Sequence, residues 1–198
     1  MLVKDNKNID FGYKIVKKKD KQNLVNSVFN SVADKYDLMN DITSLGIHRE
    51  WKKNLINWMA PQKNQKLVDI AGGTGDIARK FLKNGGHSAY VIDINEEMIK
   101  SGKVNKKNLK NIKWIVASAE DIPIDDNTFE RGTMGFGLRN ITNRAQALKE
   151  VYRILKPGGR FICLEFSHVE NELIEEIYNF WSFKCMPYIG EKVARSEE

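Results

Sequence analysis

Apolar and polar residues follow one another along the chain in blocks of strand length and of helix length. Short apolar runs predict strands at Lys66–Ala71, Ala89–Asp93, Ile112–Ala117, Arg131–Phe136 and Arg160–Phe166. Apolar residues at three- and four-residue spacing predict helices at His48–Met59, Asp76–Asn84, Glu96–Asn105, Asn143–Leu155 and Glu172–Phe183. Because strands and helices alternate, the chain is expected to fold as an α/β protein with a mostly parallel sheet covered on both faces.

The part of the chain before the first predicted strand has a different character. Residues 1–22 are polar and basic, and we expect an irregular basic tail there. Residues 23–61 are expected to form a helical cap, because apolar residues recur at helical spacing from Asn23 onward. Within this cap, Tyr36–Trp51 mixes aromatic and polar residues, which suits a flap that closes over a site. The alternative is a fixed helical pair packed on the sheet. Residues 62–198 would then form the ligand-binding domain.

The strongest local signal is the turn that follows the first predicted strand. Asp69 lies near the end of that strand, and Gly72-Gly73-Thr74-Gly75 precedes the next helix. Glycine allows a sharp turn and a close approach of a ligand to the backbone, and the first N–H groups of a helix favour negative charge. Asp93 ends the next strand about 20 residues later, where such folds place a carboxylate that accepts ribose hydroxyls. The pattern predicts a nucleoside site.

Other polar clusters also follow predicted strands. They are Asp93–Glu96, Ser118–Asp121, Gly135–Asn140 and Glu165–His168. The carboxyl ends of parallel strands share one edge of a sheet, so these clusters are expected to converge there on one ligand. The turn alone also fits GxGxxA, which leaves a nicotinamide dinucleotide, and hence a NAD-dependent oxidoreductase, as an alternative.

Further motifs resemble the class I S-adenosylmethionine (SAM) methyltransferases. Asp69 precedes the glycines as DxxxGxG, Ser118–Pro123 is similar to the adenine-holding segment, and Leu155–Arg160 reads LKPGGR between a helix and a strand. The chain also resembles the ubiquinone/menaquinone biosynthesis C-methyltransferase family from about Val25 to Ala194. That resemblance rests on the segments Tyr36–Asn40, Ser44–Trp51, Phe136–Asn140, Arg153–Gly159 and Leu164–Ser167.

This resemblance implies a Rossmann-like class I methyltransferase fold with SAM as cofactor. Carried over by position, the cofactor site comprises Asp69, Gly73, Thr74, Gly75, Asp93, Ser118, Ala119, Asp121 and Gly135. Thr74 would meet the methionyl end and Asp93 the ribose, while Ser118 and Ala119 would flank the adenine. The family usually has serine where this chain has Gly135, so a hydroxyl contact there is absent or replaced by the backbone.

The implied substrate is a membrane-embedded polyprenyl quinol, either a demethylmenaquinol or a 2-polyprenyl-6-methoxy-1,4-benzoquinol. Its ring carbon becomes nucleophilic when a hydroxyl loses its proton, so the site needs a base and a group that stabilises the phenolate, but no metal. Arg139 is the expected stabiliser, because a structural arginine in that loop would have little to pair with; a salt bridge is the alternative. The other expected catalytic residues are Tyr36 and His48, and the expected substrate-binding residues are Asn40, Arg49 and Asn140.

Each of these assignments has a plainer alternative. Tyr36 could simply pack, and His48 and Asn140 could cap the helices that follow them. The base is open between Glu165 and His168, which both follow the fifth predicted strand.

Composition places the chain among globular proteins, with 41% apolar and 29% charged residues and no apolar run long enough for a membrane span or signal peptide. Cys163 and Cys185 match no ligand pattern and are expected to be reduced thiols in a cytoplasmic protein. The net charge of +6 includes a lysine cluster between Lys14 and Lys21. A solvated tail is the plain interpretation, and contact with the inner face of an anionic membrane is the alternative. Nucleic-acid binding is not expected.

The end of the chain departs from the family pattern. Family members continue with a further pair of strands, whereas this chain ends at Glu198, inside a family motif. Without those strands a sheet edge would be uncovered. The expectation is therefore a fragment or degraded copy, or an edge covered in a homo-oligomer or a quinone-biosynthesis complex. A non-catalytic protein that binds SAM or a partner remains a further functional alternative.

Overall fold

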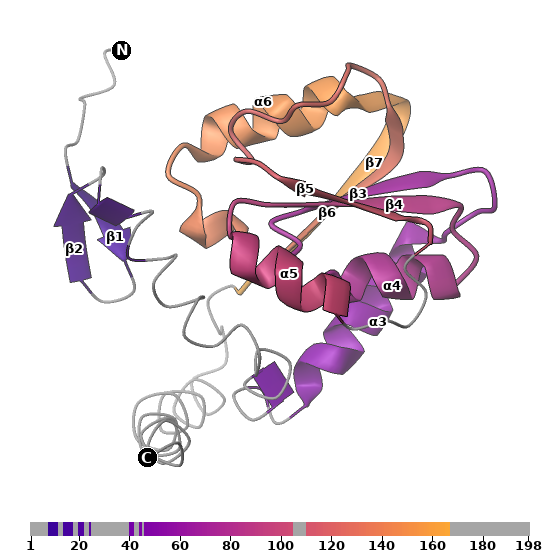
Figure 1. The fold of residues 1–198 in the computed structure, drawn as a ribbon, viewed down its shortest axis with the longest axis horizontal. Helices are drawn as coiled ribbons and strands as arrows, with labels where there is room; N and C mark the ends of the chain where they lie inside the picture. The colour runs from indigo at the N-terminus through magenta and orange to yellow at the C-terminus, as the bar shows by residue number, and fades with distance from the viewer. Residues whose placement is uncertain are drawn as a thin grey trace.

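A parallel sheet of five strands, in the order β5-β4-β3-β6-β7, forms the centre of the computed structural model (Figure 1). Its strands are β3 (Lys66–Ile70), β4 (Ser88–Asp93), β5 (Ile112–Val116), β6 (Phe129–Gly135) and β7 (Leu155–Leu164). The structure describes residues 8–11, 14–17, 20, 21, 24, 40, 41, 44, 46–104 and 110–166. The expected α/β architecture with a parallel sheet is confirmed.

Helices cover both faces of the sheet (Figure 1). On one face lie α3 (Ile47–Met59), α4 (Asp76–Lys83) and α5 (Glu96–Val104), and on the other lies α6 (Arg144–Ile154). A short 3₁₀ helix, η2 (Leu138–Asn140), follows β6. Among the described residues, no helix has the length and apolar character needed to cross a membrane.

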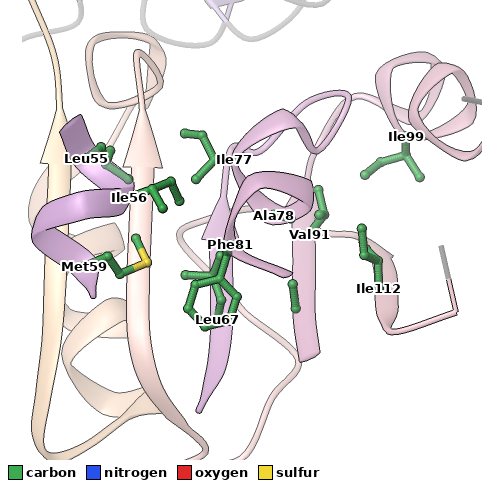
Figure 2. Packing of buried hydrophobic residues seen from close by; sticks show 11 residues of the cluster. Leu55, Ile56, Met59, Leu67, Ile77, Ala78, Phe81, Val91, Ile99 and Ile112 are labelled. Atoms are coloured by element: carbon green, nitrogen blue, oxygen red, sulfur yellow. The ribbon is translucent and has the colours of Figure 1, made fainter. Parts of the chain in front are cut away.

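The central strand β3 shows how its sequence produces the two layers. Leu67 belongs to the core shared with α3 and α4, while Val68 and Ile70 belong to the core under α6. Figure 2 shows Phe81 of α4 beside Leu67, and Leu55 and Met59 of α3 belong to the same buried cluster. Each fully buried side chain of this size contributes about 1.5–3 kcal/mol. Side chains alternate between the faces of a strand, so Asp69 must share the α3/α4 face with Leu67.

The last strand begins earlier than the sequence predicted. We expected it to start at Arg160, but β7 starts at Leu155, which pairs with Phe129 before the ladder resumes at Arg131 and Arg160. The intervening Lys156–Gly159 segment accounts for the register shift, and Gly158 takes a left-handed conformation there (φ 78°). A motif that looked like a loop is therefore an irregularity inside a strand.

The expected irregular tail over residues 1–22 is wrong in part. Asn8–Phe11 (β1) and Lys14–Lys17 (β2) form a separate antiparallel pair, with Asn8 opposite Lys17. The isoleucine, valine and phenylalanine residues of these segments favour strands, and the surrounding charges obscured that preference in the sequence. Apart from Leu24, the predicted helix from Asn23 to Tyr36 lies outside the described residues, as does the whole of the predicted helix over Glu172–Phe183.

Candidate active site

The carboxyl ends of the strands bring the predicted polar segments to one edge of the sheet. Gly72 N–H donates to the carbonyl of Ile92 at 3.1 Å, so the glycine turn is joined to the end of β4. The loops after β5 and β6 are tied to their neighbours in the same way, through Ala117 N–H to Asp93 O (3.0 Å) and Phe136 N–H to Leu164 O (2.7 Å). The strands β4 and β6 lie on opposite sides of β3 in the sheet. The glycine turn after β3 is therefore at a topological switch point, where such sheets bind ligands.

The turn itself is built for glycine. Gly73 and Gly75 have positive φ angles of 54° and 75°, which side chains rarely adopt. A Cβ atom on Gly75 would lie 2.6 Å from the Trp114 ring, and one on Gly73 would lie 2.9 Å from the Met98 methyl. Gly75 also precedes the first residue of α4, Asp76. The close packing under the turn leaves its backbone as the surface that a ligand would meet.

Asp93 holds this turn in place. One carboxylate oxygen accepts the Gly73 N–H at 2.8 Å, and the other accepts the Asn95 N–H at 2.8 Å. Burial raises the pKa of Asp93, and these N–H groups oppose that rise. A carboxylate has lone pairs for more than one bond on each oxygen, so the same group remains able to accept ligand hydroxyls.

Asp69 is the exception in hydrogen bonding. It is fully buried, and neither carboxylate oxygen has a hydrogen-bond partner among the described residues. Burial raises the pKa of Asp69 to about 7, and the nearby Ala78 N–H and Lys52 ammonium oppose this only in part. An ionised buried carboxylate without partners is costly, so this position fits a bound cation or hydrogen-bond donor.

A buried ion pair joins α3 to the start of α4. Lys52 Nζ donates to Asp76 Oδ2 at 2.9 Å, and the other Asp76 oxygen is paired with Lys80. Burial would raise the pKa of Asp76, but the two ammonium groups hold it at about 2. Sequence reasoning missed Lys52, although it continues the buried stripe of α3 from His48 to Ile56, which was the available signal.

The segment expected to flank an adenine lies in the loop after β5. Ser118 Oγ accepts the Glu120 N–H at 3.1 Å, and the Ser118 carbonyl accepts the Asp121 N–H at 3.2 Å. Ala119 packs against the core under α6, while Asp121 is exposed. The loop thus has a defined shape at the same edge as the glycine turn.

Arg139 has the partner that we expected it to lack. Its guanidinium is ion-paired with Glu165, and its backbone N–H donates to Glu165 Oε2 at 3.2 Å. The guanidinium carbon also lies 4.9 Å from the centre of the Phe166 ring. The salt-bridge alternative is therefore what the structure contains. A partner after the next strand was not visible from the spacing of the sequence.

The structure also bears on Asn140 and Gly135. Asn140 ends η2 and does not cap α6, because Asn143 caps that helix by accepting the Gln146 N–H at 3.2 Å. At Gly135, a Cβ atom would lie 2.7 Å from the terminal methyl of Ile77. A serine in its place would need that methyl to move.

The described part of the expected flap is tied together by polar contacts. His48 is buried, and its Nδ1 lies 2.8 Å from Ser44 Oγ. Burial and the Lys52 charge lower the pKa of His48. His48 does not cap α3, since that helix begins at Ile47.

The other expected quinol-side residues before and within α3 are also engaged by neighbours. Arg49 is exposed and pairs with Asp41 (Nε to Oδ1, 2.6 Å), and the Asn40 carbonyl accepts the Ser44 hydroxyl at 2.7 Å. Tyr36 lies outside the described residues.

An aromatic cluster, which sequence reasoning also missed, connects α3 to the Arg139 loop. The ring of Trp51 lies 6.1 Å from that of Phe136 and 5.8 Å from that of Phe166. Phe136 takes a positive φ of 59°, an unusual conformation for a bulky residue that is typical of functional sites. From further upstream, buried Lys21 donates to the Arg139 carbonyl at 3.0 Å. The segment before the sheet therefore reaches the same end of the molecule.

Comparison with known proteins gives concordant matches. The family model described as the ubiE/COQ5 methyltransferase family matches residues 15–198. A Brucella abortus protein named ubiquinone/menaquinone biosynthesis C-methyltransferase UbiE is 45% identical over 92% of this chain and 71% of its own length. A Rickettsia bellii protein of the same name is 47% identical over 96% of this chain and 79% of its own length. A putative methyltransferase of Bacillus halodurans is similar in structure (TM-score 0.55, 25% identity), over 65% of this chain and 56% of that one.

Proposed function

The chain belongs to the ubiE/COQ5 methyltransferase family, and on this premise we propose that it transfers a methyl group from SAM to a ring carbon of a polyprenylated quinol. The relatives are named as C-methyltransferases of ubiquinone and menaquinone biosynthesis, and they match most of this chain. The single structural observation that supports the proposal best is the buried carboxylate of Asp69, which has no hydrogen-bond partner among the described residues and lies beside a turn with positive φ angles at Gly73 and Gly75. A nicotinamide-dependent oxidoreductase, our alternative, does not agree with membership of a methyltransferase family.

The residues at the glycine turn fit the proposed cofactor. SAM supplies a methyl group on a positively charged sulfonium, next to an amino acid and an adenosine. Asp69 would provide a counter-charge, and the Gly73–Gly75 backbone with Thr74 would line the methionyl end. Asp93 would accept the ribose hydroxyls, and Ser118, Ala119 and Asp121 would hold the adenine. Holding both reactants in line can supply about 7–11 kcal/mol of the barrier.

The residues at the ends of β6 and β7 would serve the quinol. Arg139 would stabilise the negative charge that develops on a ring oxygen when its proton leaves, a contribution typically worth about 10²–10³ in rate. Asn40, His48, Arg49, Asn140 and Tyr36 are proposed on the quinol side, and the aromatic rings of Trp51, Phe136 and Phe166 would exclude water. The buried His48, with its lowered pKa, would be neutral at neutral pH and able to accept a proton.

The substrate class bears on where the protein acts. A polyprenyl tail is retained in the bilayer, so we propose peripheral contact with an anionic membrane through Lys14, Lys17, Lys18 and Lys19, each worth about 1 kcal/mol close to the lipid. Lys21 is left out, because it is buried against the Arg139 loop. Sedimentation with anionic and with neutral vesicles tests this. Equal binding to both would contradict it.

The function is tested by complementation. The chain is expressed in a strain that accumulates demethylated quinones, and the quinones are extracted and analysed. Restored methylated quinone supports the proposal. Unchanged quinones, together with tight SAM binding by the purified chain, would favour the alternative of a non-catalytic SAM-binding protein.

A further inference from the structure

Glu165 holds Arg139 at several points. Its carboxylate is ion-paired with the guanidinium, accepts the Arg139 backbone N–H at 3.2 Å and accepts the Phe166 N–H at 3.1 Å. The Phe166 ring lies 4.9 Å from the guanidinium carbon. A residue that follows β7 thus fixes both the backbone and the side chain of a residue that follows β6.

The exposure of the pair indicates what this contact contributes. The Arg139 side chain is 47% exposed and that of Glu165 is 20% exposed, so solvent screens much of their attraction. Ion pairs of this kind add little to the free energy of unfolding. Their geometric effect is larger, because a long arginine side chain with many rotamers is confined by a carboxylate and an aromatic ring.

We propose that Glu165 is the positioning residue for Arg139 in methyl transfer. By confining the guanidinium, it keeps the remaining N–H groups of Arg139 aligned toward the oxygen of the bound quinol. The contacts also argue against Glu165 as the base, because three of its roughly four acceptor positions already serve the Arg139 guanidinium and two backbone N–H groups. This inference rests on the proposed function and deepens it.

The test compares Glu165→Ala, Glu165→Gln, Arg139→Ala and the double variant Glu165→Ala/Arg139→Ala. The probe reaction uses SAM and a chemically reduced demethylmenaquinol with a short prenyl tail. Glu130 offers a matched control, because it accepts a backbone N–H (Lys66, 2.8 Å) and pairs with Lys156 at the opposite end of β6. Its side chain is 24% exposed, close to that of Glu165.

We expect Glu165→Ala to lower kcat about 10- to 100-fold, the usual cost of a displaced catalytic group, with little change in the KM for SAM. Glu165→Gln, which keeps an oxygen acceptor, should lose less. The double variant should be no slower than Arg139→Ala alone, and Glu130→Ala should keep the wild-type kcat. In protein labelled with ¹⁵N-arginine, the side-chain N–H signals of Arg139, assigned by their loss in Arg139→Ala, should shift in Glu165→Ala.

Specific outcomes would overturn the inference. A kcat for Glu165→Ala equal to that of Glu130→Ala would show that the contact between Glu165 and Arg139 does not matter for the reaction. A further loss in the double variant would show that Glu165 acts independently of Arg139, as a base would. Unchanged Arg139 signals in Glu165→Ala would exclude positioning whether or not the enzyme turns over. A wild-type protein that binds SAM but methylates no quinol would instead overturn the proposed function, and the catalytic role with it.

Discussion

The two buried acids beside the glycine turn differ in their surroundings, and this difference separates their roles. Asp93 is satisfied by the N–H groups of Gly73 and Asn95, so it supports the turn without a ligand. Asp69 has no hydrogen-bond partner among the described residues, so its burial is costly until something pairs with it. We therefore expect the loss of Asp93 to weaken SAM binding, and the loss of Asp69 to change how the free energy of unfolding depends on pH.

Asp93→Ala should weaken SAM binding by about 1.5–3 kcal/mol for each charge-assisted hydrogen bond lost. It should also lower the free energy of unfolding by about 1–3 kcal/mol, because two backbone N–H groups lose their acceptor. Calorimetric titration and thermal unfolding measure the two effects. Exposed Asp125, before β6, gives the control variant Asp125→Ala, which should change neither. An unchanged SAM affinity in Asp93→Ala would mean that the ribose binds elsewhere.

Asp69→Asn should change how stability depends on pH. The folded-state pKa of about 7 lies above the ordinary value of 3.8. The stability that the protonated carboxyl contributes is therefore complete below about pH 4 and is lost as the pH rises through about 7. Asparagine does not ionise, so the free energy of unfolding of the variant should rise relative to that of the wild type by up to about 4 kcal/mol between about pH 4 and pH 7. Urea unfolding at several pH values measures this, and parallel curves for the two proteins would contradict it.

At the residue scale, the sequence predicted the glycine turn and both acids because their motif is local. It did not predict that Arg139 pairs with Glu165, because that contact depends on how the loops after two neighbouring strands meet. It also missed the position of Lys52, since burial of an ammonium depends on an acid from another helix.

The element that connects the cap to the sheet is α3. Its buried stripe includes Lys52, whose ammonium reaches the first residue of α4. That residue, Asp76, directly follows the glycine turn. The position of α3 is thereby coupled to the start of the helix that the turn precedes.

Breaking a buried ion pair usually costs about 3–5 kcal/mol of stability. Lys52→Met should cost about 3 kcal/mol or less, because Asp76 keeps its contact with Lys80. The pKa of Asp76 is lowered to about 2 in the folded state. Its contribution is present above about pH 4 and disappears as the pH falls toward 2. The difference in the free energy of unfolding between Lys52→Met and the wild type should therefore become smaller at acid pH.

Denaturant unfolding at neutral and at acid pH measures this gap. Lys53→Met is the matched control, because Lys53 is the neighbouring residue of α3 but is exposed and paired only loosely with Glu50 (3.3 Å). It should cost less than about 1 kcal/mol. A gap for Lys52→Met that is as small as this control would show that the buried pair does not hold α3.

The segment from Tyr36 to Arg49 is predicted to close over the ligands. Amide hydrogen exchange there should slow when SAM and a quinol analogue are both present, while exchange in α6 should not change. The contact from Lys21 to the Arg139 carbonyl shows that the chain just before this cap reaches the same loop. Exchange that is already slow without ligands and does not respond to them would identify a fixed helical pair.

At the element scale, the sequence predicted the five sheet strands and the helices α3 to α6 because their hydrophobic periods are clear. The β1–β2 pair was missed, because its strand-forming residues are few and lie among charges. The start of β7 was missed because Lys156–Gly159 carries turn residues inside a paired strand.

At the scale of the whole molecule, parallel pairing brings the candidate segments that follow the strands to one edge of the sheet. Most cofactor candidates lie at or just after the ends of β3, β4 and β5, while Gly135 ends β6. The described quinol candidates lie in η2, in the first turn of α3 and at Asn40. With the roles proposed above, the two reactants would lie on adjoining parts of one site, as a direct transfer between them requires. Sequence order alone could predict this convergence, since it follows from strand–helix alternation.

Methyl transfer by the purified chain tests the proposed reaction most directly. The purified chain is incubated with SAM bearing a deuterated methyl group and with a reduced demethylmenaquinol analogue, and the product is analysed by mass spectrometry and NMR. We expect one labelled methyl group on a ring carbon of the quinone, formed in proportion to enzyme. A labelled methyl group on oxygen, or bound SAM with no labelled quinone at all, would contradict this expectation.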